Sequence, residues 1–231
     1  MTLAMELRDV RVRYGPLEAL HGVRLPVPAG ALTVLLGRNG SGRTTVLRAL
    51  AGTVLPAAGS VLLHGRDVSR LHAQKRARLG VCFVPDVGAV HGSLTVGENL
   101  ELASPGGDFG RALDGFPALR PLLGRTAGTL SGGEQRMLAV SRALLTPAGV
   151  VLLDEPAQGM APAVAARTYR LLRGLDAAVV VAEQRLPQAL TQGPGAPVVV
   201  HELRRGSVVF SGEPGELAPA GTGPPAAPRP P

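Results

Sequence analysis

A glycine-rich segment at residues 37–45 has the residue types that bind phosphate groups. It reads Gly-Arg-Asn-Gly-Ser-Gly-Arg-Thr-Thr, and glycines at these spacings let backbone N–H groups close around an anion. The apolar run Ala31–Leu36 before it is typical of a buried strand, and Thr44–Leu50 after it is typical of a helix, whose N-terminus adds positive potential. The segment therefore predicts a loop for nucleotide phosphates, formed by Gly37, Arg38, Asn39, Gly40, Ser41, Gly42, Arg43, Thr44 and Thr45.

Arginine stands at position 43, where the nucleotide-binding pattern G-x4-G-K-[ST] has lysine. Lysine carries a compact charge, whereas arginine is longer, planar and forked, so the exchange is not conservative at a tight site. Two interpretations stay open, a working variant or a site with impaired hydrolysis. The chain favours arginine throughout, because Lys75 is the one lysine among its 24 basic side chains. Phosphate binding depends largely on backbone N–H groups, and the Thr44 hydroxyl is expected to hold Mg²⁺.

A second apolar run, Val150–Leu153, ends in two carboxylates, Asp154 and Glu155. In phosphoryl transfer, an aspartate at the carboxyl end of a strand helps to hold Mg²⁺ opposite the phosphate loop. The adjacent glutamate can polarise the attacking water as a general base. Together with the glycine-rich segment, the pair predicts nucleotide hydrolysis, with Asp154 as a metal ligand and Glu155 as a catalytic residue.

Between these two motifs the chain reads Leu-Ser-Gly-Gly-Glu-Gln at residues 130–135. The serine is expected to cap the helix that follows, with the glutamate three residues later completing a capping box. This segment resembles the signature motif of the ATP-binding-cassette family, and the resemblance extends from Met5 to about Leu217. In that family the N-terminus of this helix points at the γ-phosphate of ATP bound by the other subunit. The resemblance implies that role for Ser131, Gly132, Gly133, Glu134 and Gln135.

The family resemblance implies roles for three more residues. Tyr14, between Arg and Gly, is similar to the aromatic residue that stacks on adenine, so it is expected to bind ATP. Asp86 lies in a loop where most cassettes carry a glutamine that contacts Mg²⁺ and the membrane subunit, so the resemblance implies that Asp86 is a metal ligand. A carboxylate is familiar at that position in the branch that serves branched-chain amino acids. Gln184 lies where most cassettes have a histidine, and we expect it to be catalytic; the same branch reads Val-Glu-Gln-Asn, against Ala-Glu-Gln-Arg here.

Three further segments, residues 116–119, 127–139 and 159–162, are similar to the same branch. The resemblance implies an ATPase subunit of an importer for branched-chain amino acids, and the urea and amide importers are closely similar. The implied partners are a second ATP-binding subunit (in a homodimer or heterodimer), two membrane permease subunits and, indirectly, a solute-binding protein. The implied location is the inner face of the cell membrane, on the cytoplasmic side.

One alternative is a hydrolysis-impaired regulatory subunit that binds nucleotide and pairs with an active sister cassette. The arginine at position 43 favours it, whereas the intact carboxylates and signature motif favour the ATPase. A third interpretation, a cassette protein acting on ribosomes or DNA, is disfavoured because such proteins normally have two linked cassettes or a long coiled coil.

The elements that must position these residues alternate between strands and helices, which predicts an α/β domain with a largely parallel sheet. The expected strands are Met5–Val12 paired with Leu25–Val27, then Val61–Leu63, Gly80–Val84, Val150–Leu153, Val179–Ala182 and Val198–Val200. The expected helices include Thr95–Leu102, Ala118–Leu123, Glu134–Leu145 and Ala163–Leu172. The resemblance implies a P-loop NTPase (RecA-like) core with an antiparallel β edge and a small helical subdomain inserted at about residues 87–148. The cassette is expected to span residues 5–217, followed by a Pro/Gly/Ala-rich disordered tail at 218–231.

Composition excludes several other kinds of protein. The 231 residues are 45% hydrophobic, enough for a sizeable core, and the single cysteine excludes a disulfide framework or a cysteine-rich zinc site. Only 3% are aromatic and the arginines are scattered, so no nucleic-acid partner is expected. The sequence contains neither a signal-peptide pattern nor a run of about 18 apolar residues, so we expect a soluble, cytoplasmic protein.

Overall fold

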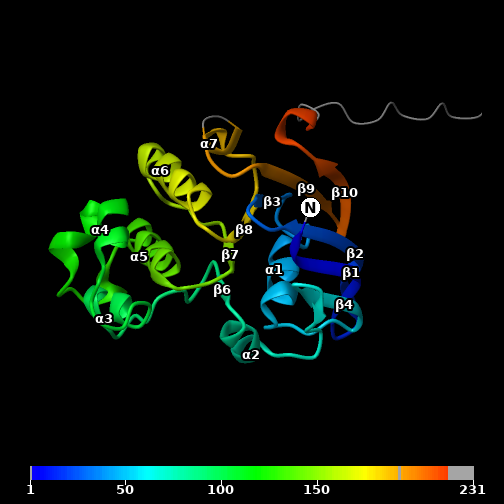
Figure 1. Ribbon diagram of the computed structural model, residues 1–231, viewed down its shortest axis with the longest axis horizontal. Helices are drawn as coiled ribbons and strands as arrows, with labels where there is room; N and C mark the ends of the chain where they lie inside the picture. Colours follow the sequence, from blue (N-terminus) through cyan, green and yellow to red (C-terminus); the bar gives the residue numbers. More distant parts are fainter. Residues whose placement is uncertain (1, 192–193, 218–231) are drawn as a thin grey trace, which may run out of the picture.

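Two β-sheets, with helices between and beside them, form the part of the chain that the computed structural model describes, residues 2–191 and 194–217 (Figure 1). The tail expected at 218–231 lies outside these residues. The larger sheet has the strand order β10-β9-β3-β8-β7-β6, and its strands from β9 to β6 run parallel. Their bounds are β3 Leu32–Leu36, β6 Val81–Val84, β7 Val150–Asp154, β8 Ala178–Glu183, β9 Val198–Arg204 and β10 Ser207–Gly212.

The parallel strands are short and apolar because both faces of the sheet are covered. Every residue of β3 and β7 is buried, as expected for a parallel sheet between two layers. Alternate residues of β7 face different cores: Val151 and Leu153 belong to one hydrophobic cluster, and Leu152 belongs to the other. The sequence prediction of a largely parallel sheet is confirmed.

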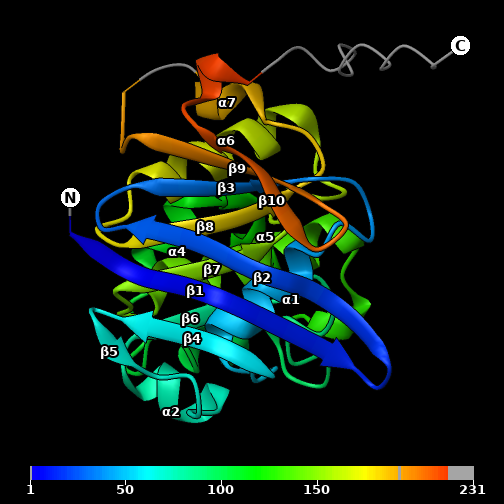
Figure 2. The ribbon, with the colours of Figure 1, turned by 90° about the vertical axis from the view of Figure 1, so that its right-hand side faces the viewer.

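The antiparallel strands form a sheet of their own that packs across one face of the parallel sheet (Figure 2). Its order is β2-β1-β4-β5, with β1 at Leu3–Tyr14, β2 at Leu17–Pro28, β4 at Ala58–Leu63 and β5 at Arg66–Asp67. The expected pairing of the first two strands is confirmed, since residue 7 lies opposite residue 25. The helix α1, Arg43–Ala51, contacts β7, β8 and β1, so it fills the space between the sheets.

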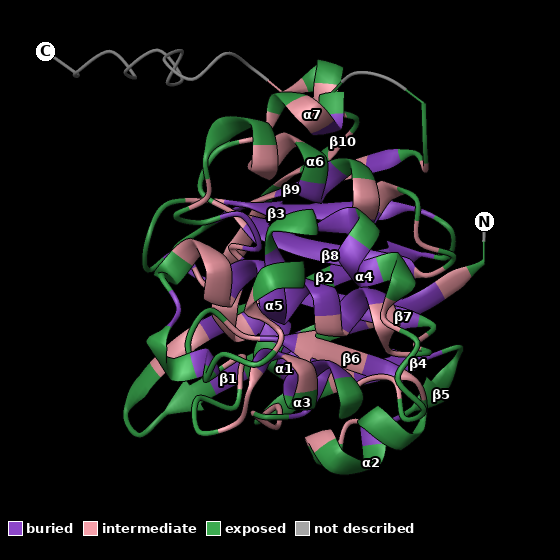
Figure 3. Ribbon diagram, turned by 90° about the vertical axis from the view of Figure 1, so that its left-hand side faces the viewer, coloured by how far each residue is buried: buried purple, intermediate pink, exposed green. Residues whose placement is uncertain are grey.

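Helices cover the opposite face of the parallel sheet, and Figure 3 shows their exposed outer sides above buried strands. Between β6 and β7 lie α3 (Val96–Glu101), α4 (Gly110–Gly115) and α5 (Gly132–Leu145), with 3-10 segments at Pro117–Leu122 and Ala127–Thr129. The remaining helical segments are α2 Ala73–Arg78, α6 Pro162–Arg173, α7 Gln188–Thr191 and a 3-10 turn at Pro214–Glu216.

The helix expected at Ala118–Leu123 is instead the 3-10 segment at Pro117–Leu122. Pro121 lies inside it and has no N–H to donate, so an α-helical bond cannot form there. Among the described residues, no helix combines the length and the apolar character that crossing a membrane requires.

Candidate functional site

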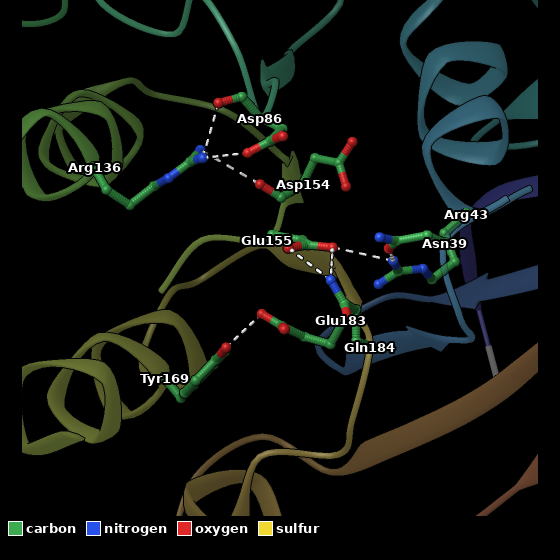
Figure 4. A network of polar contacts seen from close by, with 9 residues as sticks. All are labelled: Asn39, Arg43, Asp86, Arg136, Asp154, Glu155, Tyr169, Glu183 and Gln184. Atoms are coloured by element: carbon green, nitrogen blue, oxygen red, sulfur yellow. Dashed lines mark hydrogen bonds and ion pairs between the residues drawn. The ribbon is translucent and has the colours of Figure 1, made fainter. Parts of the chain in front are cut away.

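The predicted site residues meet at one edge of the parallel sheet, where the strands end. The strand β3 leads into the glycine-rich loop, β6 leads to Asp86, β7 ends at Asp154 and β8 ends at Glu183. Because parallel strands present their carboxyl ends at the same edge, side chains far apart in the sequence converge there. Figure 4 shows this convergence for nine polar residues.

The glycine-rich loop leaves the N-terminus of α1 open to a ligand. The helix is preceded by Gly42, whose φ of 106° favours glycine, and no side chain caps it. Its first N–H groups are thus available to an anion. At Gly37 the close packing excludes any side chain, because a Cβ atom would lie 2.4 Å from Ser41 Oγ and 2.6 Å from Leu203 O.

Backbone hydrogen bonds hold this loop from both ends. The Gly37 N–H donates to Glu183 O (N···O 3.3 Å), and the Gly206 N–H donates to Ser41 O (2.9 Å). Within the described residues, Ser41 Oγ and Arg43 Nη1 are buried without a hydrogen-bond partner. Buried polar groups are almost always paired. A buried hydroxyl and a buried guanidinium N–H without partners, beside an uncapped helix N-terminus, therefore fit a bound phosphate group.

Arg43 reaches across the site to the predicted general base. Only 5% of the residue is exposed, and its Nη2 lies 3.0 Å from Glu155 Oε1 and 3.4 Å from Asn39 Oδ1 (Figure 4). Both charged side chains of the Arg43–Glu155 pair are largely buried, with 6% and 13% exposed. This contact was not part of the sequence prediction.

Glu155 is held in a conformation that non-glycine residues seldom adopt. Its φ is 46°, and its N–H donates to Ala182 O (3.0 Å) at the end of β8. Such backbone positions tend to occur at functional sites, where the surrounding structure enforces them. The Gln184 Nε2 donates to Glu155 Oε1 at 3.1 Å. The structure thus brings together the two residues predicted to be catalytic.

Asp154 and Thr44 supply oxygen atoms suited to Mg²⁺. Asp154 is 3% exposed, and burial raises the pKa of its carboxyl, an effect that a hydrogen bond with Thr44 opposes. No group of three His, Cys, Asp or Glu side chains in the described ranges is arranged for a metal ion. Mg²⁺ prefers few protein oxygens combined with phosphate oxygens and water, and one carboxylate with one hydroxyl fits that pattern.

The structure places the Asp86 carboxylate against an arginine that the sequence prediction did not include. Arg136 Nη2 lies 2.5 Å from Asp86 Oδ1, and Figure 4 marks this contact with a dashed line. The metal-binding role of Asp86 stays a prediction. A signal for Arg136 was present, because it shares one helical face with Ala139, Val140 and Ala143, and a charge on an apolar face indicates a specific contact.

A second contact outside the prediction joins α6 to the end of β8. The Tyr169 hydroxyl donates to Glu183 Oε1, and only 5% of the tyrosine is exposed. Burial, together with the negative charge of Glu155, raises the pKa of the Glu183 carboxyl to about 7. Glu183 therefore binds its proton more tightly than an ordinary glutamate, one residue before Gln184.

The predicted signature group forms the start of α5, and its expected capping box is confirmed. Ser131 Oγ accepts from the Glu134 N–H (3.3 Å), and Glu134 Oε2 accepts from the Ser131 N–H (2.7 Å). Gly132 and Gln135 line a cleft of about 550 Å³ beside Asp86. They do not line the cleft that holds the glycine-rich loop, so within one chain the two predicted phosphate-binding groups lie apart.

The glycine-rich loop opens into a cleft of about 690 Å³, a size that suits a nucleotide. Tyr14, 40% exposed at the end of β1, lines it together with the predicted residues from Arg38 to Thr45. Stacking on adenine stays a prediction. Leu17 and Arg205, which were not predicted, line the same cleft.

Comparison with known proteins matches this chain to ABC transporters and their ATP-binding proteins. The family model for the ABC transporter matches residues 20–158. A probable branched-chain amino acid transport ATP-binding protein, LivF, of Archaeoglobus fulgidus is 35% identical over 224 residues, covering 91% of this chain and 93% of the relative. A high-affinity branched-chain amino acid transport ATP-binding protein, BraG, of Pseudomonas aeruginosa is 36% identical over 194 residues, covering 78% and 82%.

Solved structures show the same fold. The ADP conformation of MJ1267, an ATP-binding cassette of an ABC transporter, superposes with a TM-score of 0.76 at 22% identity, covering 92% of this chain and 91% of that one. A nucleotide-free ATP-binding cassette from an ABC transporter gives a TM-score of 0.76 at 22% identity, covering 92% of each chain.

Proposed function

This chain belongs to the ABC transporter family, and on that premise we propose that it is the ATP-binding subunit of an importer for branched-chain amino acids or related solutes. Two relatives that match most of the chain are named as branched-chain amino acid transport ATP-binding proteins. The family couples ATP hydrolysis to transport. Urea and amides stay within the proposed range of solutes, because the chain itself does not contact the solute.

The observation that carries the proposal is the convergence of phosphate, metal and base groups at one sheet edge. The loop from Gly37 to Thr45 binds the phosphates through backbone N–H groups and the unpaired donors of Ser41 and Arg43. Thr44 and Asp154 would hold Mg²⁺, which would supply positive charge to balance that of the phosphates.

Glu155 then takes the proton of the attacking water as general base. Its carboxylate is oriented by the hydrogen bond from Gln184. Burial raises the pKa of the Asp154 carboxyl, and a bound cation would favour its charged form.

Hydrolysis at this loop depends on whether Arg43 releases Glu155 when ATP binds. Because Arg43 pairs with Glu155, the base is engaged by a cation before any phosphate arrives. We propose that bound phosphates draw the guanidinium away and free Glu155. The alternative, a hydrolysis-impaired regulatory subunit paired with an active sister cassette, requires this ion pair to persist with ATP bound.

The proposed partners follow from the family and from the two separate clefts. Gly132 and Gln135 line a different cleft from that of the chain's own phosphate loop, so Ser131–Gln135 are proposed to meet the ATP of a second cassette, identical or not. Two permease subunits bind the cassettes at the inner, cytoplasmic face of the membrane. A solute-binding protein contacts the permeases and acts on this chain only indirectly.

The test is solute uptake in proteoliposomes that contain this chain, its co-expressed permeases and any sister cassette. We expect ATP inside the vesicles to drive uptake of leucine, isoleucine or valine when the solute-binding protein is outside. Uptake of urea or an amide instead would correct the solute class. Failure of the chain to bind ATP at all would overturn the proposal.

A further inference from the structure

A buried arginine joins the helix that begins at Ser131 to the ends of two central strands. Arg136 lies near the start of α5, and only 8% of the residue is exposed. Its Nη1 donates to Pro85 O (3.2 Å) and Asp154 O (3.4 Å). Its Nη2 donates to Asp86 O (2.8 Å) and lies 2.5 Å from Asp86 Oδ1. Figure 4 shows the guanidinium directed at the loop after β6 and at the end of β7.

These contacts are specific to the forked shape of arginine. One guanidinium serves four acceptor atoms on three residues, which a lysine ammonium with three donors cannot match in the same geometry. A charge in this position is stable only because it is paired and hydrogen-bonded. Removing it would take this donor from the Asp86 carboxylate and from three backbone carbonyls, those of Pro85, Asp86 and Asp154. The start of α5, the loop after β6 and the end of β7 are therefore held as one unit.

We propose that Arg136 is a positioning residue that couples the helix start at Ser131–Gln135 to this chain's own nucleotide cleft. The inference rests on the proposed function, because it takes Ser131–Gln135 as the group that meets the partner's ATP. Arg136 belongs to the helix proposed to meet the partner's ATP. Its side chain contacts the backbone of Asp154, which is proposed to serve the nucleotide bound by this chain. A shift of α5 is passed directly to the metal-binding strand end.

Asp86 is the more exposed member of this ion pair. Its side chain is 42% exposed, and the residue lines both the cleft beside α5 and the cleft of the phosphate loop. While its carboxylate is paired with Arg136, its negative charge is compensated. Arg136 thus fixes the loop after β6 against the end of β7.

The test compares Arg136→Gln and Arg136→Lys in the assembled transporter, with Arg120→Gln as the matched control. Arg120 forms an exposed ion pair with Asp114 on the same helical layer, so the control removes an equivalent charge pair away from the site. We expect Arg136→Gln to lower kcat for ATP hydrolysis about 10- to 100-fold, the scale of a small misplacement of reacting groups. Binding of a fluorescent ATP analogue should stay unchanged, Arg136→Lys should recover part of kcat, and the control should match wild type.

A double-mutant cycle identifies the partner. Once Arg136→Gln has broken the pair, Asp86→Asn should lower kcat by a smaller factor than it does in wild type, because part of its effect there comes from losing the same contact. Multiplied losses in the double variant, or full kcat in Arg136→Gln, would overturn the proposal. Parallel loss of ATP binding and kcat would also overturn it, since that result indicates general damage to the fold.

Amide hydrogen exchange supplies a readout that does not depend on hydrolysis. In Arg136→Gln, residues 85–92 and the first turn of α5 should exchange faster together, while the phosphate loop keeps its wild-type protection. Unchanged exchange in residues 85–92 would overturn the coupling even if hydrolysis changed. If wild type neither binds nor hydrolyses ATP, the proposed function fails, and hydrogen exchange still decides whether Arg136 joins these elements.

Discussion

Arg43 and Glu155 form a largely buried ion pair, with 3.0 Å between Nη2 and Oε1, although 112 residues separate them in the sequence. The pair links the phosphate loop directly to the predicted general base. While the guanidinium occupies Glu155 Oε1, that oxygen is not free to contact an attacking water. Under the proposed function, bound phosphates would compete for the same guanidinium, and this one contact would couple nucleotide binding to activation of the base.

Arg43→Lys separates the two interpretations of the loop. The shorter ammonium offers a point charge instead of a fork, so it is expected to hold Glu155 less firmly and to serve the phosphates equally well. We expect a faster rate of ATP hydrolysis under single-turnover conditions with saturating Mg²⁺-ATP. In a heterodimer the gain is limited to the share of one site, whereas in a homodimer both sites gain.

Arg48→Lys, a change on the same helix α1 outside the cleft-lining residues, is the matched control for Arg43→Lys and should leave the rate unchanged. Equal rates for wild type and Arg43→Lys would contradict the prediction. They would mean that the arginine works as well as lysine and reflects only the low lysine content of the chain.

Glu155→Gln tests the general base itself. The amide cannot accept the proton of the attacking water, and loss of a general base typically lowers the rate about 10²- to 10⁴-fold. ATP binding should persist, since the phosphate contacts are made by the loop, and a dimer closed on unhydrolysed ATP should accumulate. Steady-state hydrolysis and size-exclusion chromatography in ATP check both expectations. A wild-type rate in this variant would remove Glu155 from the role.

The Glu183 carboxyl should make stability depend on pH between about 4.5 and about 7. Its pKa is raised to about 7 in the folded chain by burial and the charge of Glu155, whereas the unfolded chain has an ordinary value of about 4.3. The folded state therefore binds more protons in this range, and the free energy of unfolding falls as pH rises.

Glu183→Gln removes that dependence. Between about pH 4.5 and about pH 7, wild type should lose up to about 3 kcal/mol of stability relative to the variant, as the pKa difference implies. Urea denaturation at several pH values measures the difference. Glu101→Gln, at an exposed glutamate of α3, should show the wild-type slope. An identical slope in Glu183→Gln would show that the carboxyl does not hold its proton in the folded chain.

Gly37→Ala should disable the phosphate loop without removing any polar group. The added Cβ would lie 2.4 Å from Ser41 Oγ and 2.6 Å from Leu203 O, and the second of these is backbone that cannot rotate away. We expect the loop to shift, with ATP affinity reduced at least about tenfold, a loss of about 1.4 kcal/mol. In Gly124→Ala the new Cβ meets no atom within 4 Å, so that variant should bind ATP normally. Equal affinities would contradict the proposed packing.

The backbone of the site was predictable from the sequence, because its elements leave local patterns. Short apolar runs that stop at glycines or carboxylates indicate buried parallel strands, and their carboxyl ends must share one edge of the sheet. The capping box at Ser131 and Glu134 was predictable for the same reason, since it depends on residues three positions apart.

The side-chain contacts across the site were not predictable in this way. The pairing of Arg43 with Glu155 depends on the left-handed backbone at the glutamate, φ 46°, which no local pattern indicates for that residue type. The engagement of Asp86 by Arg136 depends on how α5 lies over the end of β6. Both contacts join elements that are distant in sequence, so only the packed fold defines them.

The separation of the signature helix and the phosphate loop into two clefts has a kinetic consequence for the purified protein. If each complete site takes one group from each of two chains, an isolated chain holds two halves and no whole site. At concentrations well below the dissociation constant of the dimer, hydrolysis should then rise with the square of total protein concentration in a homodimer. For a heterodimer it should rise with the product of the two subunit concentrations, so dilution alone would distinguish a self-pairing chain from one that needs a sister.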